Sequence, residues 1–82
     1  IHRGVTALAE TPPANLGAGS RLSPREREVL WWAAAGKTVW ETGRLLGLSE
    51  QTAQSYIRDA IRRLGAINKT HAVAEAVRLG LI

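Results

Sequence analysis

Residues 38–65 carry the pattern that most limits how this chain can fold. The pattern predicts a short amphipathic helix, the turn Gly47-Leu48-Ser49, and then a longer amphipathic helix. Gly47 suits the left-handed conformation that ends a helix, and Ser49 suits the cap of the next one. Gly43 lacks a side chain where we expect the two helices to pack closely. Two helices joined by so short a turn are typical of a helix-turn-helix, which makes DNA the first partner to consider.

The second helix of this motif, over about residues 50–64, has one apolar face and one polar face. The apolar residues recur every three or four positions and predict a buried stripe: Ala53, Ile57, Ala60, Ile61 and Leu64. The opposite face is polar and net basic, with Gln51, Gln54, Ser55, Arg58 and Arg62. Because Gln54 and Arg58 lie one turn apart on the free face, both could enter a major groove together. We predict that these two side chains contact base edges.

Capping signals predict the other helices. Ser23 can cap a helix that begins at Pro24, and Glu26 completes a capping box, so we expect a helix over about residues 24–35. The same cap-and-glutamate spacing recurs where the motif begins at Thr38. A last helix is expected over about residues 69–79. Because no strand pattern is visible, the sequence predicts an all-α domain of four helices.

The three tryptophans allow two interpretations. They could stack on bases, as in proteins that bind single strands, but packing is favoured because the chain has no Phe and one Tyr. We expect Trp31, Trp32 and Trp40 to lie in the core or at its edge. Since neighbouring residues of a helix point in different directions, we expect one of Trp31 and Trp32 at the surface. Such an exposed ring would suit contact with a neighbouring domain or with RNA polymerase.

Composition narrows the classes of function. Eighty-two residues form one small domain, so a large catalytic pocket and an enzyme are not expected. The absence of cysteine removes thiolate zinc sites, and His2 and His71 lack partners at metal-ligand spacing, so we expect no metal. With no long apolar run and no signal peptide, we expect a cytoplasmic protein without a membrane partner. The net charge of +4 moderately favours an anionic partner.

Residues 1–21 differ in character from the rest of the chain. Residues 1–10 have weak helical spacing, and residues 11–20 are rich in Pro, Gly and Ala, as in a flexible linker. We therefore expect a short helix or a disordered linker before a domain that spans 22–82. Because the first residue is Ile1 rather than Met, we expect the chain to be a fragment of a longer protein.

Three segments of the chain resemble the LuxR-type family of bacterial transcription regulators, over residues 22–82 as a whole. They are LSPREREVL, GKTVWETGRLLGLSEQTAQSYI and IRRLGAINKTHAVAEAVRLGLI. The VWE segment and the RLGLI ending are more similar to the quorum-sensing branch than to the branch controlled by phosphorylation. The resemblance implies a homodimer on an inverted-repeat operator in double-stranded DNA. It also implies control by an N-terminal domain, absent here, that binds an acyl-homoserine lactone, with no cofactor in residues 22–82. Residues 1–10 are similar to the final helix of that domain, so residues 1–21 are expected to be its end and a linker.

The resemblance also assigns roles to residues. In the family the third helix enters the major groove, and its base contacts match Gln54 and Arg58. Four positions match contacts to the sugar-phosphate backbone: Lys37, Thr52, Tyr56 and Arg63. The polar face adds three secondary candidates, Gln51, Ser55 and Arg62, although basic residues near a helix C-terminus also stabilise the helix dipole. The fourth helix commonly supplies dimer contacts, for which the candidates are Ala72, Val73, Ala76 and Val77.

Two alternatives stay open at this point. The domain could be the output of a response regulator controlled by phosphorylation, since only residues 1–22 bear on the controller. It could also be a module that binds another protein, because a fold does not fix a function. The salt dependence of the affinity distinguishes the second alternative from DNA binding. Affinity for DNA falls steeply as the salt concentration rises, whereas affinity for an apolar protein surface does not.

Overall fold

The computed structural model describes residues 22–82, which form four helices: α2 (Pro24–Ala34), α3 (Val39–Leu46), α4 (Glu50–Leu64) and α5 (Lys69–Arg78). No strand occurs in this range, so the prediction of an all-α domain with four helices is confirmed. Helices α2 and α5 each end one residue before the predicted end, because Ala35 and Leu79 are their C-caps. The predicted short helix or linker over residues 1–21 lies outside the described residues.

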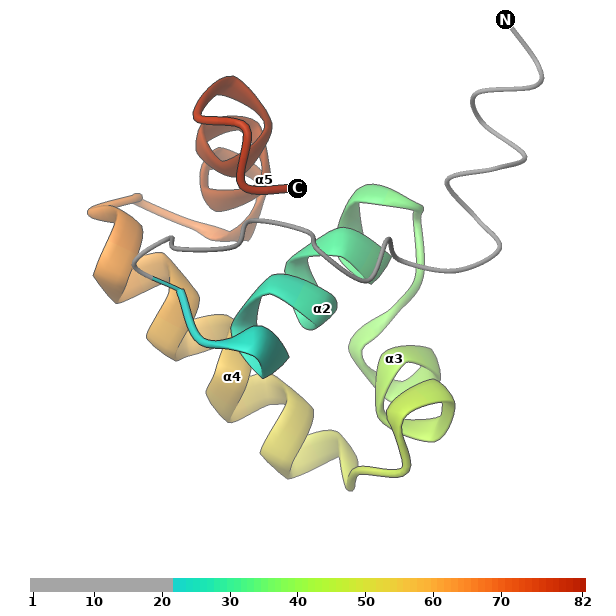
Figure 1. Cartoon of the computed structure of the whole chain (residues 1–82). Coiled ribbons are helices and arrows are strands. Elements are labelled where there is room, and N and C mark those ends of the chain that lie inside the picture. Colours follow the sequence, from blue (N-terminus) through green and yellow to red (C-terminus); the bar gives the residue numbers. More distant parts are fainter. Residues whose placement is uncertain (1–21) are drawn as a thin grey trace, which may run out of the picture.

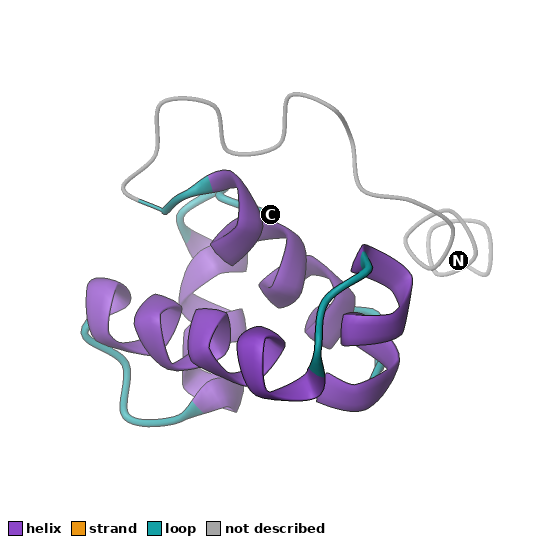
Figure 2. Cartoon of the chain, turned by 90° about the horizontal axis from the view of Figure 1, so that it is seen from below, coloured by secondary structure: helices purple, strands orange, loops and turns teal. Residues whose placement is uncertain are grey.

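Helix α4 is the element against which the others are arranged. It packs against α2, α3 and α5, and α2 also packs against α3 and α5. Figure 1 shows α2 along the middle of α4, with α3 near the beginning of α4 and α5 near its end. In Figure 2, seen from below, no other helix covers the near side of α4. One face of α4 is therefore left free, as the amphipathic pattern predicts.

The core lies between α2, α4 and α5. Its buried apolar residues come from these helices and from the segment before α2: Leu22, Val29, Leu30, Ile57, Ala60, Ala72 and Ala76. The predicted stripe of α4 is confirmed, because Ala53, Ile57 and Ala60 are buried while Ile61 and Leu64 are only partly buried. The described helices include none long and apolar enough to cross a membrane.

Both Trp31 and Trp32 are buried, so the expectation that one of them lies at the surface is wrong. Their rings meet edge to face, with centroids 5.0 Å apart and planes at 88°. Adjacent side chains of a helix point about 100° apart, because a turn holds about 3.6 residues. Both can still be buried here because α3, α4 and α5 all pack against α2 and cover it from several sides.

The predicted caps fix where the helices begin. The hydroxyl of Ser23 accepts a hydrogen bond from the Glu26 N–H (3.2 Å), and the Glu26 carboxylate accepts one from the Ser23 N–H (3.0 Å). Thr38 and Glu41 form the same reciprocal pair at the start of α3, at 3.0 and 2.8 Å. Asn68 caps α5. These bonds satisfy backbone N–H groups that a helix start otherwise leaves without partners.

Candidate nucleic-acid interface

The turn between α3 and α4 sets the direction of α4. Gly47 ends α3 in the left-handed conformation, with φ at +71°. The Leu48 N–H then donates to the carbonyl of Gly43 (2.7 Å), which folds the turn back over α3. A Cβ on Gly43 would lie only 2.8 Å from the carbonyl oxygen of Leu48, so Gly43 does lie at a close approach, but the turn makes it and not the second helix as predicted. Ser49 caps α4 through the Thr52 N–H (3.0 Å).

The free face of α4 holds the predicted base-reading residues together. Four side chains line a shallow hollow along this face: Glu50, Gln51, Gln54 and Arg58. Arg58 is exposed and donates to the hydroxyl of Ser55 (3.2 Å), within its own helix. Gln54 and Arg58 thus lie in one hollow on the open side of a helix, and a major groove about 12 Å wide admits such a helix. Arg58 has no described partner on another helix that DNA would have to displace.

Arg63 is held by an ion pair between two helices. Its Nε lies 3.1 Å from Oε2 of Glu26, a side chain that is only 3% exposed. The other oxygen of this carboxylate accepts the bond from Ser23, so Glu26 joins the start of α2 to the end of α4. Sequence reasoning missed this pair, because its partners are 37 positions apart in the sequence and no local spacing connects them. Arg63 therefore has a structural role beside the predicted contact with the DNA backbone.

Removing the carboxylate tests this role. We expect Glu26→Ala to lower the free energy of unfolding by about 1–3 kcal/mol, because the Ser23 N–H and the Arg63 guanidinium would both lose their partner. Urea unfolding followed by tryptophan fluorescence measures the change. Glu28→Ala is the matched control: within residues 22–82 Glu28 pairs only with Arg25, on the exposed side of α2, and such a pair contributes about 0–1 kcal/mol. Equal midpoints for the two variants would contradict the structural role.

The other predicted backbone contacts are spread around α4. The Thr52 hydroxyl bonds to Ser49 (2.9 Å) at the start of the helix, and Tyr56 packs partly against the core. Arg62, near the other end, pairs with Asp59 (3.1 Å), and both side chains are exposed. Lys37 lies apart from α4, in the loop before α3. The structure thus groups Gln51 with Gln54 and Arg58 in one hollow, and contact of any of these residues with DNA stays a prediction.

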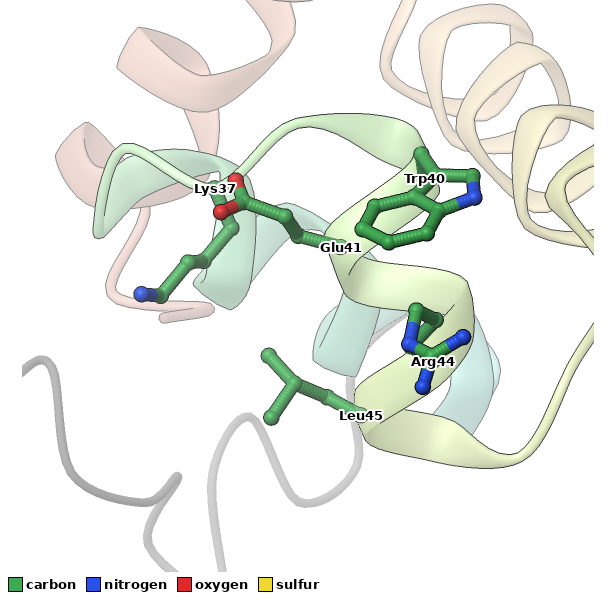
Figure 3. A pocket seen from close by; sticks show the side chains of 5 residues that line it. All are labelled: Lys37, Trp40, Glu41, Arg44 and Leu45. Carbon is green, nitrogen blue, oxygen red and sulfur yellow. The ribbon is translucent and has the colours of Figure 1, made fainter.

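A second hollow, of about 220 Å³, lies on the outer side of α3. Trp40 and Leu45 on its wall are 53% and 52% exposed, so the expectation of core or edge packing is wrong for Trp40. The guanidinium of Arg44 lies 5.0 Å from the centre of the Trp40 ring, a cation–π contact. Figure 3 shows these two side chains along one side of α3, with Lys37 and Glu41 on the other side. We name these five residues the α3 surface.

The acidic member of the α3 surface is held in its charged form. Hydrogen bonds from the backbone and then the side chain of Thr38 lower the pKa of Glu41, and the charge of Lys37 acts in the same direction. Because the pKa is lowered in the folded chain, the stabilising effect is present above the unfolded pKa. It is lost as the pH falls through the folded pKa. At neutral pH the α3 surface therefore carries both signs of charge around an exposed indole.

The predicted dimer residues of α5 do not share one exposed face. Ala72 and Ala76 are completely buried in the core, so they offer no surface to a second chain, and their proposed role is wrong. Val73 is partly buried against the core. Val77 is 57% exposed, and Leu79, the C-cap of α5, is 41% exposed. Only part of the predicted set could therefore meet a partner.

Comparison with known proteins identifies the chain. Residues 20–76 match the family described as "Bacterial regulatory proteins, luxR family". The chain belongs to the luxR family of bacterial regulatory proteins. It is thus a helix-turn-helix DNA-binding output domain of a LuxR-type regulator, and the LuxR-type resemblance is confirmed.

Relatives within the luxR family are similar over most of this chain. The transcriptional activator protein BjaR1 of Bradyrhizobium diazoefficiens is 51% identical over 63 residues, covering 77% of this chain and 26% of the relative. The quorum sensing-dependent transcriptional regulator RpaR of Rhodopseudomonas palustris is 44% identical over 81 residues, covering 99% of this chain and 32% of the relative. The transcriptional repressor ThaA of Burkholderia thailandensis is 41% identical over 73 residues, covering 89% of this chain and 29% of the relative. The chain thus spans less than a third of the length of each of these LuxR-type proteins.

Proposed function

We propose that this domain binds an inverted-repeat operator in double-stranded DNA as a homodimer, with α4 of each copy in the major groove. The observation that carries the proposal is the free face of α4, where Gln54 and Arg58 lie together in one hollow. The turn at Gly43 and the cap at Ser49 hold the start of α4 in a fixed direction. A rigid helix with a polar outer face is what reading of base edges requires.

Bases and phosphates would contribute in different ways. Gln54 can bond bidentately to adenine and Arg58 to guanine, which gives sequence preference. Phosphate contacts give affinity without preference, and their candidates lie on α4 and on the loop before α3: Lys37, Gln51, Thr52, Ser55, Tyr56, Arg62 and Arg63. On α5 the remaining candidates for dimer contact are Val73 and Val77, the latter exposed beside Leu79.

Salt dependence tests whether DNA is the partner of the isolated domain. With about four phosphate contacts per domain, we expect affinity for a duplex to fall about 100-fold between about 50 and 200 mM salt, from a slope of about 0.9 per phosphate. Fluorescence anisotropy of a labelled duplex measures this fall. An affinity that stays flat over the same range would contradict DNA binding and would favour the alternative of a module for protein–protein contact.

We also propose that the whole protein is a quorum-sensing regulator whose N-terminal domain binds an acyl-homoserine lactone. The proposal is supported by the VWE and RLGLI segments, which are similar to that branch, and by the name of RpaR, which describes that relative as quorum sensing-dependent. A full-length protein whose DNA binding responds to an acyl-homoserine lactone would support it. Control by phosphorylation of a receiver domain instead would contradict it.

A further proposed partner is RNA polymerase, which would contact the α3 surface. The supporting observation is the exposure of Trp40 and Leu45 on a helix other than α4. We expect Trp40→Ala in the full-length protein to change transcription from a target promoter several-fold while leaving operator affinity within about twofold, because α4 is untouched. Transcription in vitro and anisotropy measure the two effects. Parallel losses of both would show that Trp40 acts through DNA binding or folding.

A further inference from the structure

Glu50 is an acidic residue on the face of α4 that we propose for DNA. It is exposed and lines the same hollow as Gln54 and Arg58. Residues four apart in a helix are separated by about one turn, so these three side chains form a single row along α4. A carboxylate in such a row is repelled by DNA phosphates. The dipole of α4 favours an acidic residue in the first turn, but it leaves the oxygens of the Glu50 carboxylate without a hydrogen-bond donor among the described residues.

A capping box, which explains two of the other acidic residues, does not explain Glu50. Glu26 and Glu41 are the third residues of their helices, and both close capping boxes. Glu50 is the first residue of α4, and the third position, which Ser49 caps, is held by Thr52. A capping box is therefore not formed at the start of this helix.

Ion pairing within the domain does not explain it either. Within residues 22–82, every other carboxylate has a hydrogen-bonding or ionic partner: Glu26 with Arg63, Glu28 with Arg25, Glu41 with Thr38, Asp59 with Arg62, and Glu75 with Arg78. No hydrogen bond or ion pair in this range involves the side chain of Glu50. Its acceptor oxygens are thus free to meet a donor from outside the domain.

The major groove offers a donor that fits a carboxylate. A carboxylate only accepts hydrogen bonds, and the edge of cytosine presents the N4 amino donor without the N7 acceptor that adenine places beside its own amino group. Guanine and thymine present acceptors, which a carboxylate repels. In helix-turn-helix proteins the N-terminal residues of the recognition helix contact base edges, and Glu50 holds that place in α4.

We propose that Glu50 is a third specificity-determining residue of the DNA interface, which accepts a hydrogen bond from the N4 amino group of a cytosine. This inference rests on the proposed function of α4. Four residues of helix rise by about 6 Å, and successive bases of a strand lie about 3.4 Å apart. The cytosine therefore lies within about two base pairs of the position read by Gln54. The charge of Glu50 also weakens binding to all other sequences.

Selection from a pool of random duplexes, read by sequencing, tests the proposal. Wild type is compared with Glu50→Ala and Glu50→Gln, and Gln54→Ala marks the position that Gln54 reads. We expect wild type to prefer cytosine near that position, by about tenfold over the other bases. Glu50→Ala should lose the preference for cytosine but keep the preferences at all other positions. It should also bind a scrambled duplex more tightly. Glu50→Gln shifts the preference toward adenine, because its amide matches that base.

Glu28→Ala is the matched control, because it makes the same charge change on α2, away from the free face of α4. It should raise binding to the scrambled duplex less than Glu50→Ala does, and it should select the same sequences as wild type. Identical selected sequences for wild type and Glu50→Ala would overturn the role of Glu50 and leave the proposed function intact. If Glu50→Ala lowered the base preference equally at every position of the selected sequence, the proposal would be overturned too. Glu50 would then act only through the structure of the start of α4. Failure of wild type to select any sequence would instead overturn the proposed function, and this inference with it.

Discussion

Gly43→Ala is expected to destabilise the domain by about 1–3 kcal/mol, the usual cost of forcing an extra carbon into a packed site. The new Cβ would lie 2.8 Å from the carbonyl oxygen of Leu48 and 3.3 Å from that of Ser49. Both atoms are backbone atoms of the turn, so neither can rotate away as a side chain would. The turn must shift, and α4 must shift with it. We therefore expect weaker DNA binding as well.

The sign of the change decides this prediction. Alanine in place of a helical glycine normally stabilises a helix by about 0.5–1 kcal/mol. Urea unfolding of Gly43→Ala, followed by circular dichroism, measures the sign, and a rise in stability would contradict the close approach. Gly47→Ala is a useful comparison, because a Cβ there meets nothing within 4 Å and only the left-handed backbone is strained. That variant should also be less stable, by about 1–2 kcal/mol.

Arg58→Ala is expected to lower affinity for the cognate operator by about 1–3 kcal/mol and to relax the preference at one base pair. The fold should not change, because the Arg58 guanidinium is exposed and, among the described residues, bonds only to Ser55 on the same helix. Anisotropy titrations with cognate and scrambled duplexes separate the two possible roles. A loss confined to the cognate duplex indicates base reading.

Arg25→Ala is the control for charge in this experiment. Arg25 lies on α2 and pairs with Glu28, so the variant removes the same charge away from the free face of α4. It should weaken binding to both duplexes slightly and equally. Equal losses on both duplexes for Arg58→Ala would show that Arg58 contacts only phosphate and would contradict its role in base reading.

The helices and their starts could be predicted from the sequence because their signals are local. Ser23 and Glu26 cap α2 over three residues, and Thr38 and Glu41 do the same for α3. The buried stripe of α4 likewise results from spacing within one helix. Such features depend on neighbours that the chain itself places together, so no knowledge of the packing is needed.

Features that depend on packing between helices could not be predicted in this way. The burial of both Trp31 and Trp32 results from three helices covering α2, which no spacing within α2 reveals. The pair of Glu26 with Arg63 joins residues from α2 and α4. Trp40 has a large apolar ring that suggests burial, yet it lies on the outer side of α3. Residue type and local spacing could not distinguish these cases.

The free face of α4 has one feature that the sequence predicts and one that only the structure reveals. Gln54 and Arg58 could be placed on one face from the helical period alone. That Glu50 joins the same hollow, and that its carboxylate is free of partners within the described residues, needed the positions of all the other charged side chains. A charged side chain without a hydrogen-bonding or ionic partner can be recognised only when the partners of the other charged side chains are known.

Binding of this domain to a pool of random duplex DNA at moderate salt, with sequencing of the retained fraction, tests the central claim most directly. We expect an enriched inverted repeat, whose half-site spacing would give the geometry of the dimer on DNA. Retained DNA without any enriched sequence, released as salt rises, would mean that the domain binds only through non-specific electrostatics. That result would contradict the claim that α4 reads bases.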